Sequence, residues 1–520
     1  MKDTVILVIL ISLFSGFYYD SVLDKGPLNT HIWRQSDCLS ITSNYAKGAS
    51  FLDPQLHTLS ADNYSSGKSA GEFPILYFTI GQLWKITGES FFVYRLVYLS
   101  ILITSLILCF KALHLMLKNT VWSIVLTLLL YTSPVFVFYG VSFLTDAPAF
   151  SFVIIALYFF TLYAIDKKHR NFFISMLFFA LAGLIKISSL IAFIFLAGVF
   201  FIERIRKIQT LGSRKLFIGS KTEWIGLISV FVVIVLWYAY AFNYNQLHGF
   251  KYTYNSIHPF WLIEKFNWEA ILASLKNFTS HSYYSRFMIF SMLLIGIVNL
   301  LNYKKLPMLA NLSNLFIPIG GLIYMLLWLP LLGNHDYYFI ALLIVLPGIL
   351  FPFAWLLKIY CTTLFNSKLT ALFISIFLFL NFAYCYSHIH LKTRSNESLY
   401  YLIGNHQLVK HMKWVNWDAQ TNLYRYYRMR SYLSDIGIDK DDLVISMNDN
   451  SFSISLYFMD RNGWSNHKKL LESKKIIKTL IERNAKYLVI SDKVYLTKPF
   501  LQPFLSDQIG EFEGIRIFKL

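Results

Sequence analysis

"HIWRQSDCLS", residues 31–40, follows the first apolar run of the chain and places His31, Arg34 and Asp37 at intervals of three. At this spacing the three side chains share one face of a helix. Ionisable residues so close to an apolar segment require a structural or functional explanation, and the rest of the sequence indicates which one applies.

A helix is predicted over this stretch, with Asn29 or Thr30 as its N-cap and Gly48 at its end. The simplest interpretation is a helix at a membrane interface, stabilised by a salt bridge between Arg34 and Asp37. The alternative is a functional cluster of charges beside the membrane.

The composition indicates a multi-pass membrane protein. Of the 520 residues, 56% are hydrophobic and only 15% are charged, far from the composition of a soluble globular domain. Apolar runs long enough to cross a bilayer recur along most of the chain. The net charge of +18 is typical of basic cytoplasmic loops and of contacts with anionic membrane lipids. Nucleic acid is not an expected partner, because no RNA- or DNA-binding motif is present.

Eleven segments are predicted to span the membrane, and the first is interpreted as an uncleaved helix because no small-residue cleavage site follows it. They lie at about residues 4–19, 95–117, 121–140, 147–165, 171–185, 187–203, 224–243, 286–302, 310–330, 337–357 and 370–387. The stretch 73–87 is apolar but short and is interrupted by Pro74, Gln82 and Lys85. It is therefore predicted to be a helix lying at the interface.

Basic residues predict the orientation of these spans. With a cytoplasmic N-terminus, the inside loops carry "DKKHR", "ERIRKIQTLGSRKLFIGSK" and "NYKKL", whereas the short outside loops 141–146 and 331–336 carry no Lys or Arg. This alternation follows the positive-inside rule. It places the C-terminal segment on the outer, extracytoplasmic side of the membrane.

The chain is predicted to consist of two domains. Residues 1–390 form a transmembrane domain whose first outer loop, 20–94, carries interfacial helices; a further outer region is expected at 244–285. Residues 391–520 form a small extracytoplasmic α/β domain. Strand patterns occur there at 442–447, 487–491 and 514–520, and a helical pattern lies between the first two, which predicts a partly parallel sheet.

Two acidic residues stand next to apolar segments. Glu72 precedes the interfacial helix, where an acid is favoured by the helix dipole. Asp146, in "LTDAPAF", either caps the following helix together with Thr145 or has a functional role. A charge at the end of a span is costly unless it faces water or a partner.

Further polar residues are expected at the same face. "GNHDYYFI" contains His335, Asp336 and Tyr338; paired tyrosines there are typical of an aromatic belt, but a His-Asp pair is not. Lys186, in "LAGLIKISSL", and Arg286, in "HSYYSRFM", either extend their charges to the interface or bind a lipid phosphate. Acids and bases thus gather at the outer face.

The motifs "HIWRQSD", "GEFPILYFTIGQLWKITGES" followed by Arg95, "LTDAPAF" and "HDYYFI" together resemble bacterial integral-membrane glycosyltransferases of the GT-C fold. The most similar group is glycosyltransferase family 39, the protein-mannosyltransferase and aminoarabinose-transferase type. The resemblance covers about residues 1–390. It implies a polytopic helical enzyme of the bacterial cell membrane that takes its sugar from a polyprenyl-phosphate-linked donor.

The resemblance also implies roles for individual residues. Asp37 matches the position of the catalytic base, and Asp146 that of a second acid that supports the site. Protein mannosyltransferases often carry an Asp-Glu pair where this chain has Asp37 and Cys38. The acceptor, whether glycan, lipid or protein, is therefore left open.

The chemistry of sugar transfer from a polyprenyl phosphate suggests roles for the other polar residues. Polyprenyl phosphate leaves as a stabilised anion, so the reaction needs a base for the acceptor hydroxyl and cations for the phosphate. Direct attack opposite the phosphate would invert the anomeric centre, and no metal or other cofactor is required. The predicted substrate-binding residues are His31, Arg34, Glu72, Lys186, Arg286, His335, Asp336 and Tyr338.

Two other classes of protein were weighed against a transferase. A transporter or flippase of lipid-linked sugars is expected to show paired broken helices and charges near the bilayer centre. A polysaccharide ligase is expected to carry arginines on a large outer loop, and region 244–285 has none. The one-sided cluster of acids and bases favours the transferase.

Overall fold

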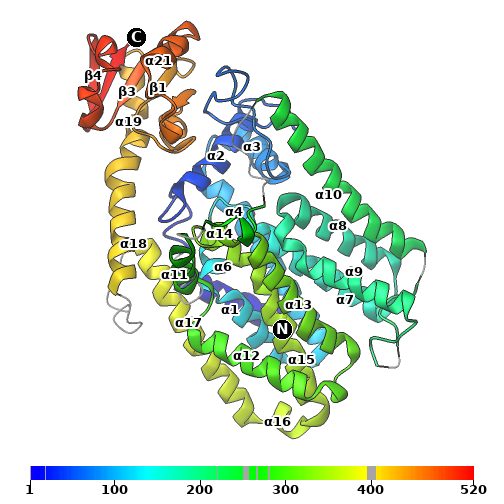
Figure 1. Ribbon diagram of the computed structural model, residues 1–520. Coiled ribbons are helices and arrows are strands. Elements are labelled where there is room, and N and C mark those ends of the chain that lie inside the picture. Colours follow the sequence, from blue (N-terminus) through cyan, green and yellow to red (C-terminus); the bar gives the residue numbers. More distant parts are fainter. Residues whose placement is uncertain are drawn as a thin grey trace.

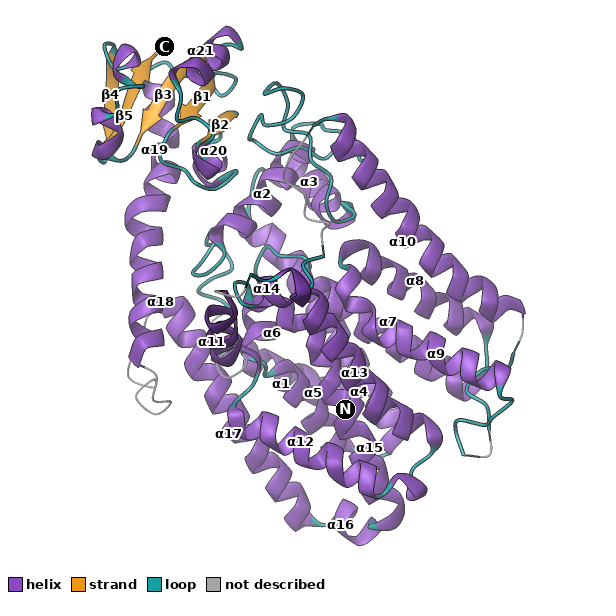
Figure 2. Ribbon diagram, viewed as in Figure 1, coloured by secondary structure: helices purple, strands orange, loops and turns teal. Residues whose placement is uncertain are grey.

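The computed structural model describes residues 2–17, 19–212, 214–219, 221–249, 257–264, 267–278, 282–394 and 406–520. Figure 1 shows a body of helices with a small domain at one end, and Figure 2 shows that the strands lie in this small domain. The predicted combination of a helical membrane part with a C-terminal α/β domain is confirmed in outline. Parts of the predicted outer region 244–285, at 250–256, 265–266 and 279–281, lie outside the described residues.

Each predicted span coincides with a helix or with a helix in two parts. The helices are α1 (Lys2–Gly16), α4 (Phe91–Leu117), α5 (Thr120–Tyr131) with α6 (Pro134–Tyr139), α7 (Asp146–Asp166), α8 (His169–Ile185), η1 (Ile187–Leu190) with α9 (Ile191–Ile205), α10 (Lys221–Leu247), α12 (Arg286–Leu301), α13 (Met308–Leu327), η6 (Asp336–Ile344) with α15 (Val345–Tyr360), and α17 (Lys368–Arg394). Within the described part of the chain, seven of these are long and apolar enough to cross a membrane, and α5, α8 and α12 are shorter apolar helices. The chain is a multi-pass membrane protein, while the number of eleven spans stays a prediction.

A proline divides the predicted span 121–140 into α5 and α6. Pro134 has no backbone N–H and cannot continue the hydrogen bonding of α5. Thr132, at the break, accepts hydrogen bonds from the Asn381 side chain of α17, at 3.0 Å to its carbonyl oxygen and 2.7 Å to its hydroxyl. The exposed backbone at the break is thereby satisfied inside the protein, as the apolar surroundings require.

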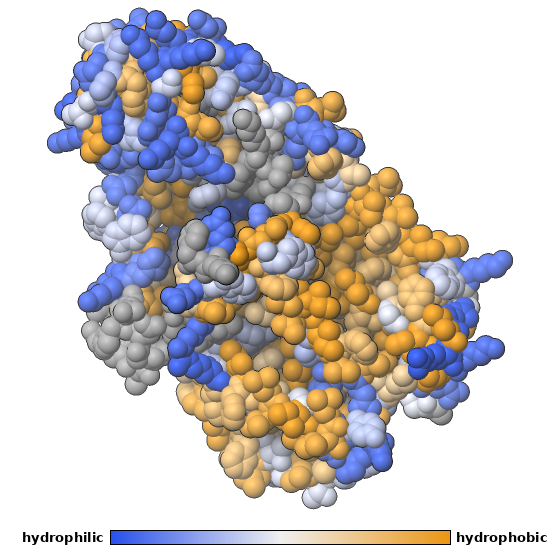
Figure 3. Space-filling view, viewed as in Figure 1, coloured by the Kyte–Doolittle hydropathy of each residue, from blue (hydrophilic) through white to orange (hydrophobic). Residues whose placement is uncertain are grey.

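The surface of the helical body is suited to lipid. Figure 3 shows hydrophobic residues over most of the visible face of the body and hydrophilic residues over the C-terminal domain. Large exposed apolar side chains occur on α10, α12, α13 and α17, among them Phe231, Leu293, Leu322 and Phe379. Apolar surface of this extent marks contact with a membrane.

Two helices of the first loop, α2 (Ile32–Ala46) and α3 (Ile75–Thr87), pack together near the C-terminal domain (Figure 1). The helix predicted at 73–87 is confirmed, but its face with Tyr77 and Ile80 is buried in the protein. The predicted N-cap of α2 was wrong. His31 takes the N-cap position with a left-handed backbone (φ 60°) and makes no side-chain cap, because its imidazole is engaged elsewhere.

The C-terminal domain follows a long helical connection. The predicted boundary at residue 390 falls within α17, and residues 395–405 lie outside the described residues. Three helical elements then lead to the sheet: α18 (His406–Asp418), η8 (Ala419–Leu423) and α19 (Tyr424–Asp435). This column contacts α17 through α18.

The sheet of this domain has five strands in the order β2-β1-β3-β5-β4. They are β1 (Leu443–Ser446), β2 (Gly463–Ser465), β3 (Ala485–Ile490), β4 (Gln508–Phe512) and β5 (Ile515–Lys519). Strands β2, β1 and β3 are parallel, and β3, β5 and β4 are antiparallel. The three predicted strands and the helix α21 (Lys474–Glu482) are confirmed. Strands β2 and β4 were missed because one has three residues and the other contains a glycine.

The first loop extends this sheet. The Leu59 N–H donates to the Gly463 carbonyl at 2.8 Å, and the Gly463 N–H donates to the His57 carbonyl at 3.1 Å. Lys47, just after α2, forms an ion pair with Asp460 at 2.9 Å. The C-terminal domain is therefore joined to the loop that carries α2.

Candidate active site

Four charged side chains from distant parts of the sequence meet in what we call the Lys186 cluster: Arg34, Glu72, Asp146 and Lys186. Arg34 Nη2 lies 2.5 Å from Glu72 Oε1, and Lys186 Nζ lies 3.3 Å from both Glu72 Oε1 and Asp146 Oδ1. None of the four side chains is more than 14% exposed. Two acids and two bases thus neutralise one another, as buried charges must.

The fold positions each member of this cluster at the end of a helix. Arg34 lies in the first turn of α2, Asp146 is the first residue of α7, and Lys186 lies in extended backbone between α8 and η1. Glu72 is brought to Lys186 by the backbone, because the Phe73 N–H donates to the Leu184 carbonyl at 3.0 Å. The cluster therefore depends on tertiary contacts between loops.

Pairing keeps this cluster ionised despite its burial. Burial by itself raises the pKa of Glu72, but the charges of Arg34 and Lys186 outweigh it and lower that pKa to about 2. Burial lowers the pKa of Lys186, but Asp146 and Glu72 raise it above its usual value. Glu72 is therefore an anion and Lys186 a cation at neutral pH.

Asp37 lies one helical turn after Arg34 on α2 and is fully buried. Arg34 and Asp37 therefore share one face of α2 as predicted, whereas His31, the third residue of the predicted face, lies before the first residue of the helix. Bulk water is excluded from its carboxylate.

A second set of side chains surrounds Asp336, and we call it the Asp336 network. Lys392 Nζ lies 2.7 Å from Asp336 Oδ2, and His31 Nε2 lies 3.3 Å from Asp336 Oδ1. The Tyr139 hydroxyl donates to Asp336 Oδ1 at 2.5 Å, and the Ser282 hydroxyl donates to Oδ2 at 3.0 Å. One carboxylate therefore gathers the start of α2, the end of α6 and the last turns of α17.

Aromatic rings join the two groups of charges. His335 stacks on His31 with ring centroids 5.2 Å apart, and the Tyr337 ring meets His31 edge-on at 5.1 Å. On the other side, Lys186 Nζ lies 5.4 Å from the centroid of the Tyr338 ring. Burial and then the neighbouring His31 lower the pKa of His335 to about 3, so its imidazole is neutral at pH 7. The polar site is continuous from Lys186 to Lys392.

Most of the predicted substrate-binding residues are brought together. The Lys186 cluster contains three of them, Arg34, Glu72 and Lys186, together with Asp146. The Asp336 network contains Asp336 and His31; His335 stacks on His31, and Tyr338 contacts His335. Thr145 occupies the N-cap position of α7 without a side-chain cap. Arg286 is exposed at the start of α12, and no ion pair between described residues connects it to either group.

Sequence reasoning missed Lys392, Tyr139 and Tyr337. Lys392 resembled an ordinary basic residue flanking a membrane span. Nothing in the sequence distinguished Tyr139 from the other tyrosines, whereas Tyr337 was part of the tyrosine pair in "GNHDYYFI", from which Tyr338 was chosen.

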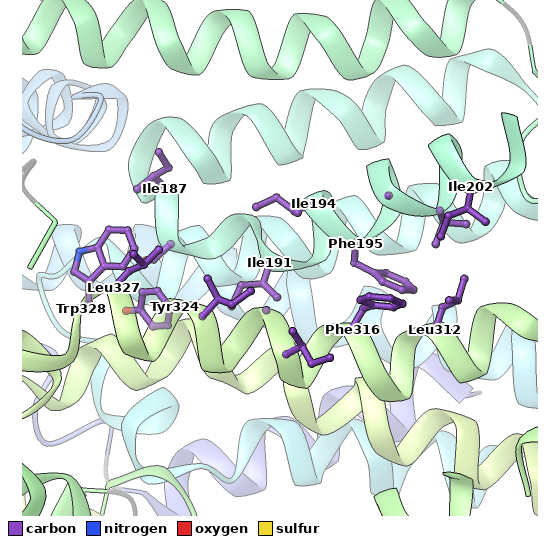
Figure 4. A pocket seen from close by; sticks show the side chains of 16 residues that line it. Ile187, Ile191, Ile194, Phe195, Ile202, Leu312, Phe316, Tyr324, Leu327 and Trp328 are labelled. Atoms are coloured by element: carbon purple, nitrogen blue, oxygen red, sulfur yellow. The ribbon is translucent and has the colours of Figure 1, made fainter. Parts of the chain in front are cut away.

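An apolar groove of about 480 Å³ runs between η1–α9 and α13, and its lining begins at Ile187 and Ser188, the two residues that follow Lys186. Figure 4 shows its two walls facing each other, one carrying Ile187, Ile191, Ile194, Phe195 and Ile202 and the other carrying Leu312, Phe316, Tyr324, Leu327 and Trp328. Ile187 and Ile202 are fifteen positions apart, which corresponds to roughly 22 Å of helix. At the polar end, the Tyr324 hydroxyl donates to the Tyr338 carbonyl at 3.1 Å.

Comparisons with known proteins agree with this geometry. Residues 71–242 match the family described as dolichyl-phosphate-mannose-protein mannosyltransferase. No curated protein matches the sequence. The structure of ArnT from Cupriavidus metallidurans in the apo state is similar at a TM-score of 0.55 and 8% identity, over 100% of this chain and 98% of that one. The same protein bound to undecaprenyl phosphate gives 0.54 and 10%, over 99% and 97%.

A third similar structure is the oligosaccharyltransferase of Archaeoglobus fulgidus in the apo form, at a TM-score of 0.53 and 12% identity, over 94% of this chain and 69% of that one. The structural likenesses show the fold, and the family match covers the segment that contains Glu72, Asp146 and Lys186. Together they confirm the resemblance inferred from the motifs and the enzyme class, a membrane glycosyltransferase of the lipid-phosphate-dependent type.

Proposed function

We propose that this chain transfers a sugar from a polyprenyl-phosphate-linked donor to an acceptor hydroxyl at the outer face of the bacterial cell membrane. Asp37 serves as the base, and Arg34 and Lys186 bind the phosphate. The observation that carries the proposal is a lysine that is ion-paired to two buried acids and stands in the chain directly before Ile187, a lining residue of a lipid-sized apolar groove.

The groove supports a polyprenyl donor. Its lining is almost wholly aliphatic and aromatic, which suits an isoprenoid chain. A chain lying in it places its phosphate beside Lys186, where the Lys186 and Arg34 cations can bind phosphate oxygens. The likeness to ArnT bound to undecaprenyl phosphate supports the same choice of lipid.

The buried acids support the chemistry. Glu72 and Asp146 hold Lys186 in place, and the cation is in position before the phosphate departs. Asp37 takes the proton from the acceptor hydroxyl as the new glycosidic bond forms and the bond to the phosphate oxygen breaks. Attack on the face opposite the leaving phosphate inverts the anomeric centre. The exclusion of bulk water protects the donor from hydrolysis.

The Asp37→Asn variant tests the assignment of the base. Loss of a general base costs about 10²- to 10⁴-fold in rate, and the amide keeps the shape of the side chain. We expect mass spectrometry of envelope glycans and glycolipids to show a sugar that is missing in a deletion strain, restored by the wild type and not by Asp37→Asn.

Two measurements make this test specific. Asp507→Asn, an exposed carboxylate in the C-terminal domain, is the matched control and should restore the sugar. Purified Asp37→Asn in nanodiscs should still bind undecaprenyl phosphate, which shows that the protein is folded. Full restoration of the sugar by Asp37→Asn would rule out this base and favour a transport role.

A further inference from the structure

We propose that a second cavity, on the far side of the Asp336 network from the apolar groove, binds the saccharide part of a glycan acceptor. This inference rests on the proposed function, since it names the acceptor class for the same site. We call the cavity the acceptor recess. Its polar lining residues are Lys25, Asn29, Lys392, Thr393, Asn416, Gln420 and Tyr424.

The acceptor recess has the size of a ligand site. Its volume is about 480 Å³, within the range of small-molecule pockets. It is formed where residues 25–29 of the first loop meet the end of α17 and the connection from α18 to η8. Lys25 and Gln420 are exposed, so the recess is open to solvent. It shares no lining residue with the apolar groove.

Two arms connect the recess to the proposed reaction site. Lys392 lines the recess, and its ammonium group pairs with Asp336 at 2.7 Å. Asn29 also lines the recess, and two residues later His31 contacts the same carboxylate at 3.3 Å. An acceptor held in the recess therefore lies against the network that continues to Lys186.

The turn that carries Asn29 has two left-handed residues. Asn29 and His31 both have left-handed backbone conformations, with φ of 54° and 60°. Such conformations are uncommon for residues other than glycine, although Asn and His adopt them more readily than most. The turn places Asn29 at the recess and His31 against Asp336.

One buried acceptor atom in this turn has no hydrogen-bond partner among the described residues. The Asn29 side chain is 3% exposed, and its Nδ2 donates to Asn416 Oδ1 at 2.9 Å. No described residue donates a hydrogen bond to Asn29 Oδ1. An unsatisfied buried carbonyl oxygen costs about 1–3 kcal/mol, and a ligand hydroxyl in the recess would remove that cost.

The lining chemistry fits a saccharide. Carboxamides both donate and accept hydrogen bonds, as sugar hydroxyls do, and three of them line the recess, at Asn29, Asn416 and Gln420. Arg95 holds one wall of the recess in place, because its guanidinium donates to the carbonyls of Lys25 and Gly26 at 2.8 Å each.

The experiment uses the full chain in nanodiscs and two variants chosen to fold. Asn29→Gly removes the carboxamide at a left-handed position that glycine accepts. Gln420→Trp fills the recess from an exposed position. Asn422→Ala is the matched control: Asn422 lies in η8 like Gln420, but its amide does not line the recess. Saturation-transfer NMR with a panel of methyl glycosides reads saccharide binding without catalysis.

We expect the wild type and Asn422→Ala to bind at least one methyl glycoside and both recess variants to lose it by about tenfold or more. Undecaprenyl phosphate affinity should change by less than about twofold in every variant. In the deletion strain, the recess variants should leave the acceptor unmodified while Asn422→Ala restores it.

The opposing results are equally definite. Unchanged glycoside binding in Gln420→Trp, or binding of unglycosylated Ser/Thr peptides in place of glycosides, overturns the saccharide assignment. Loss of undecaprenyl phosphate in the recess variants assigns the cavity to the donor instead. A different result would contradict the proposed function itself: a wild-type protein that does not bind undecaprenyl phosphate.

Discussion

Replacing Lys186 by methionine removes the ammonium group that lies between Glu72 and Asp146 while keeping an unbranched side chain of similar length. The ammonium is 3.3 Å from a carboxylate oxygen of each acid. At an effective dielectric constant of about 20, each pair has a gross attraction of about 5 kcal/mol. Removing one partner of such a buried pair costs about 3–5 kcal/mol of stability.

The second variant separates this structural effect from a functional one. Lys186→Met/Asp146→Asn removes both charges of one pair and leaves the Arg34–Glu72 pair in place. Because the uncompensated buried carboxylate is gone, we expect the double variant to recover about 1–3 kcal/mol relative to the sum of the single variants. Thermal unfolding in detergent of the wild type, both single variants and the double variant gives this coupling energy.

Lipid binding then reads the functional role of Lys186. A hydrogen bond to a charged group contributes about 1.5–3 kcal/mol, so undecaprenyl phosphate should bind the stable double variant about 10- to 100-fold more weakly than the wild type. Undecaprenol has no phosphate and should bind both equally. A double variant that is stable and binds undecaprenyl phosphate as tightly as the wild type refutes the phosphate role. A Lys186→Met variant as stable as the wild type refutes the electrostatic reasoning.

Three further predictions address the rest of the molecule. The pKa of Glu72 is lowered from 4.5 to about 2 in the folded protein. Ionised Glu72 therefore stabilises the fold above pH 4.5, and about 3 kcal/mol of this stability is lost as the pH falls toward 2. The free energy of unfolding of Glu72→Gln, measured from pH 5 to pH 2.5, should decline less steeply than that of the wild type. Gly198 lines the groove with no atom within 4 Å of an added Cβ, so Gly198→Phe should block undecaprenyl phosphate binding without loss of melting temperature, while Leu236→Phe on the lipid-facing side of α10 should bind normally. A Cβ on Gly463 would lie 1.9 Å from the Val444 carbonyl oxygen, so Gly463→Ala should cost more than about 3 kcal/mol in thermal unfolding, and a wild-type melting temperature would contradict the close approach.

The sequence by itself determined the parts that depend on local pattern. Apolar runs of membrane length predicted the helices α4 to α17, because a backbone in lipid must satisfy its own hydrogen bonds. Alternating apolar residues predicted β1, β3 and β5, and the spacing of Arg34 and Asp37 predicted one helix face. Charged residues beside apolar segments stood out for the same reason, since an isolated charge there is costly.

Only the tertiary structure decided which charges meet. Glu72 and Lys186 are 114 positions apart along the chain, and a hydrogen bond between their neighbouring backbones brings them together. Lys392 was indistinguishable from a flanking basic residue until it was seen against Asp336, and Arg286 looked equivalent to Lys186 until it was seen exposed. Ion pairs form through short distances in space, and these distances are set by the packing of distant helices, which no local pattern encodes.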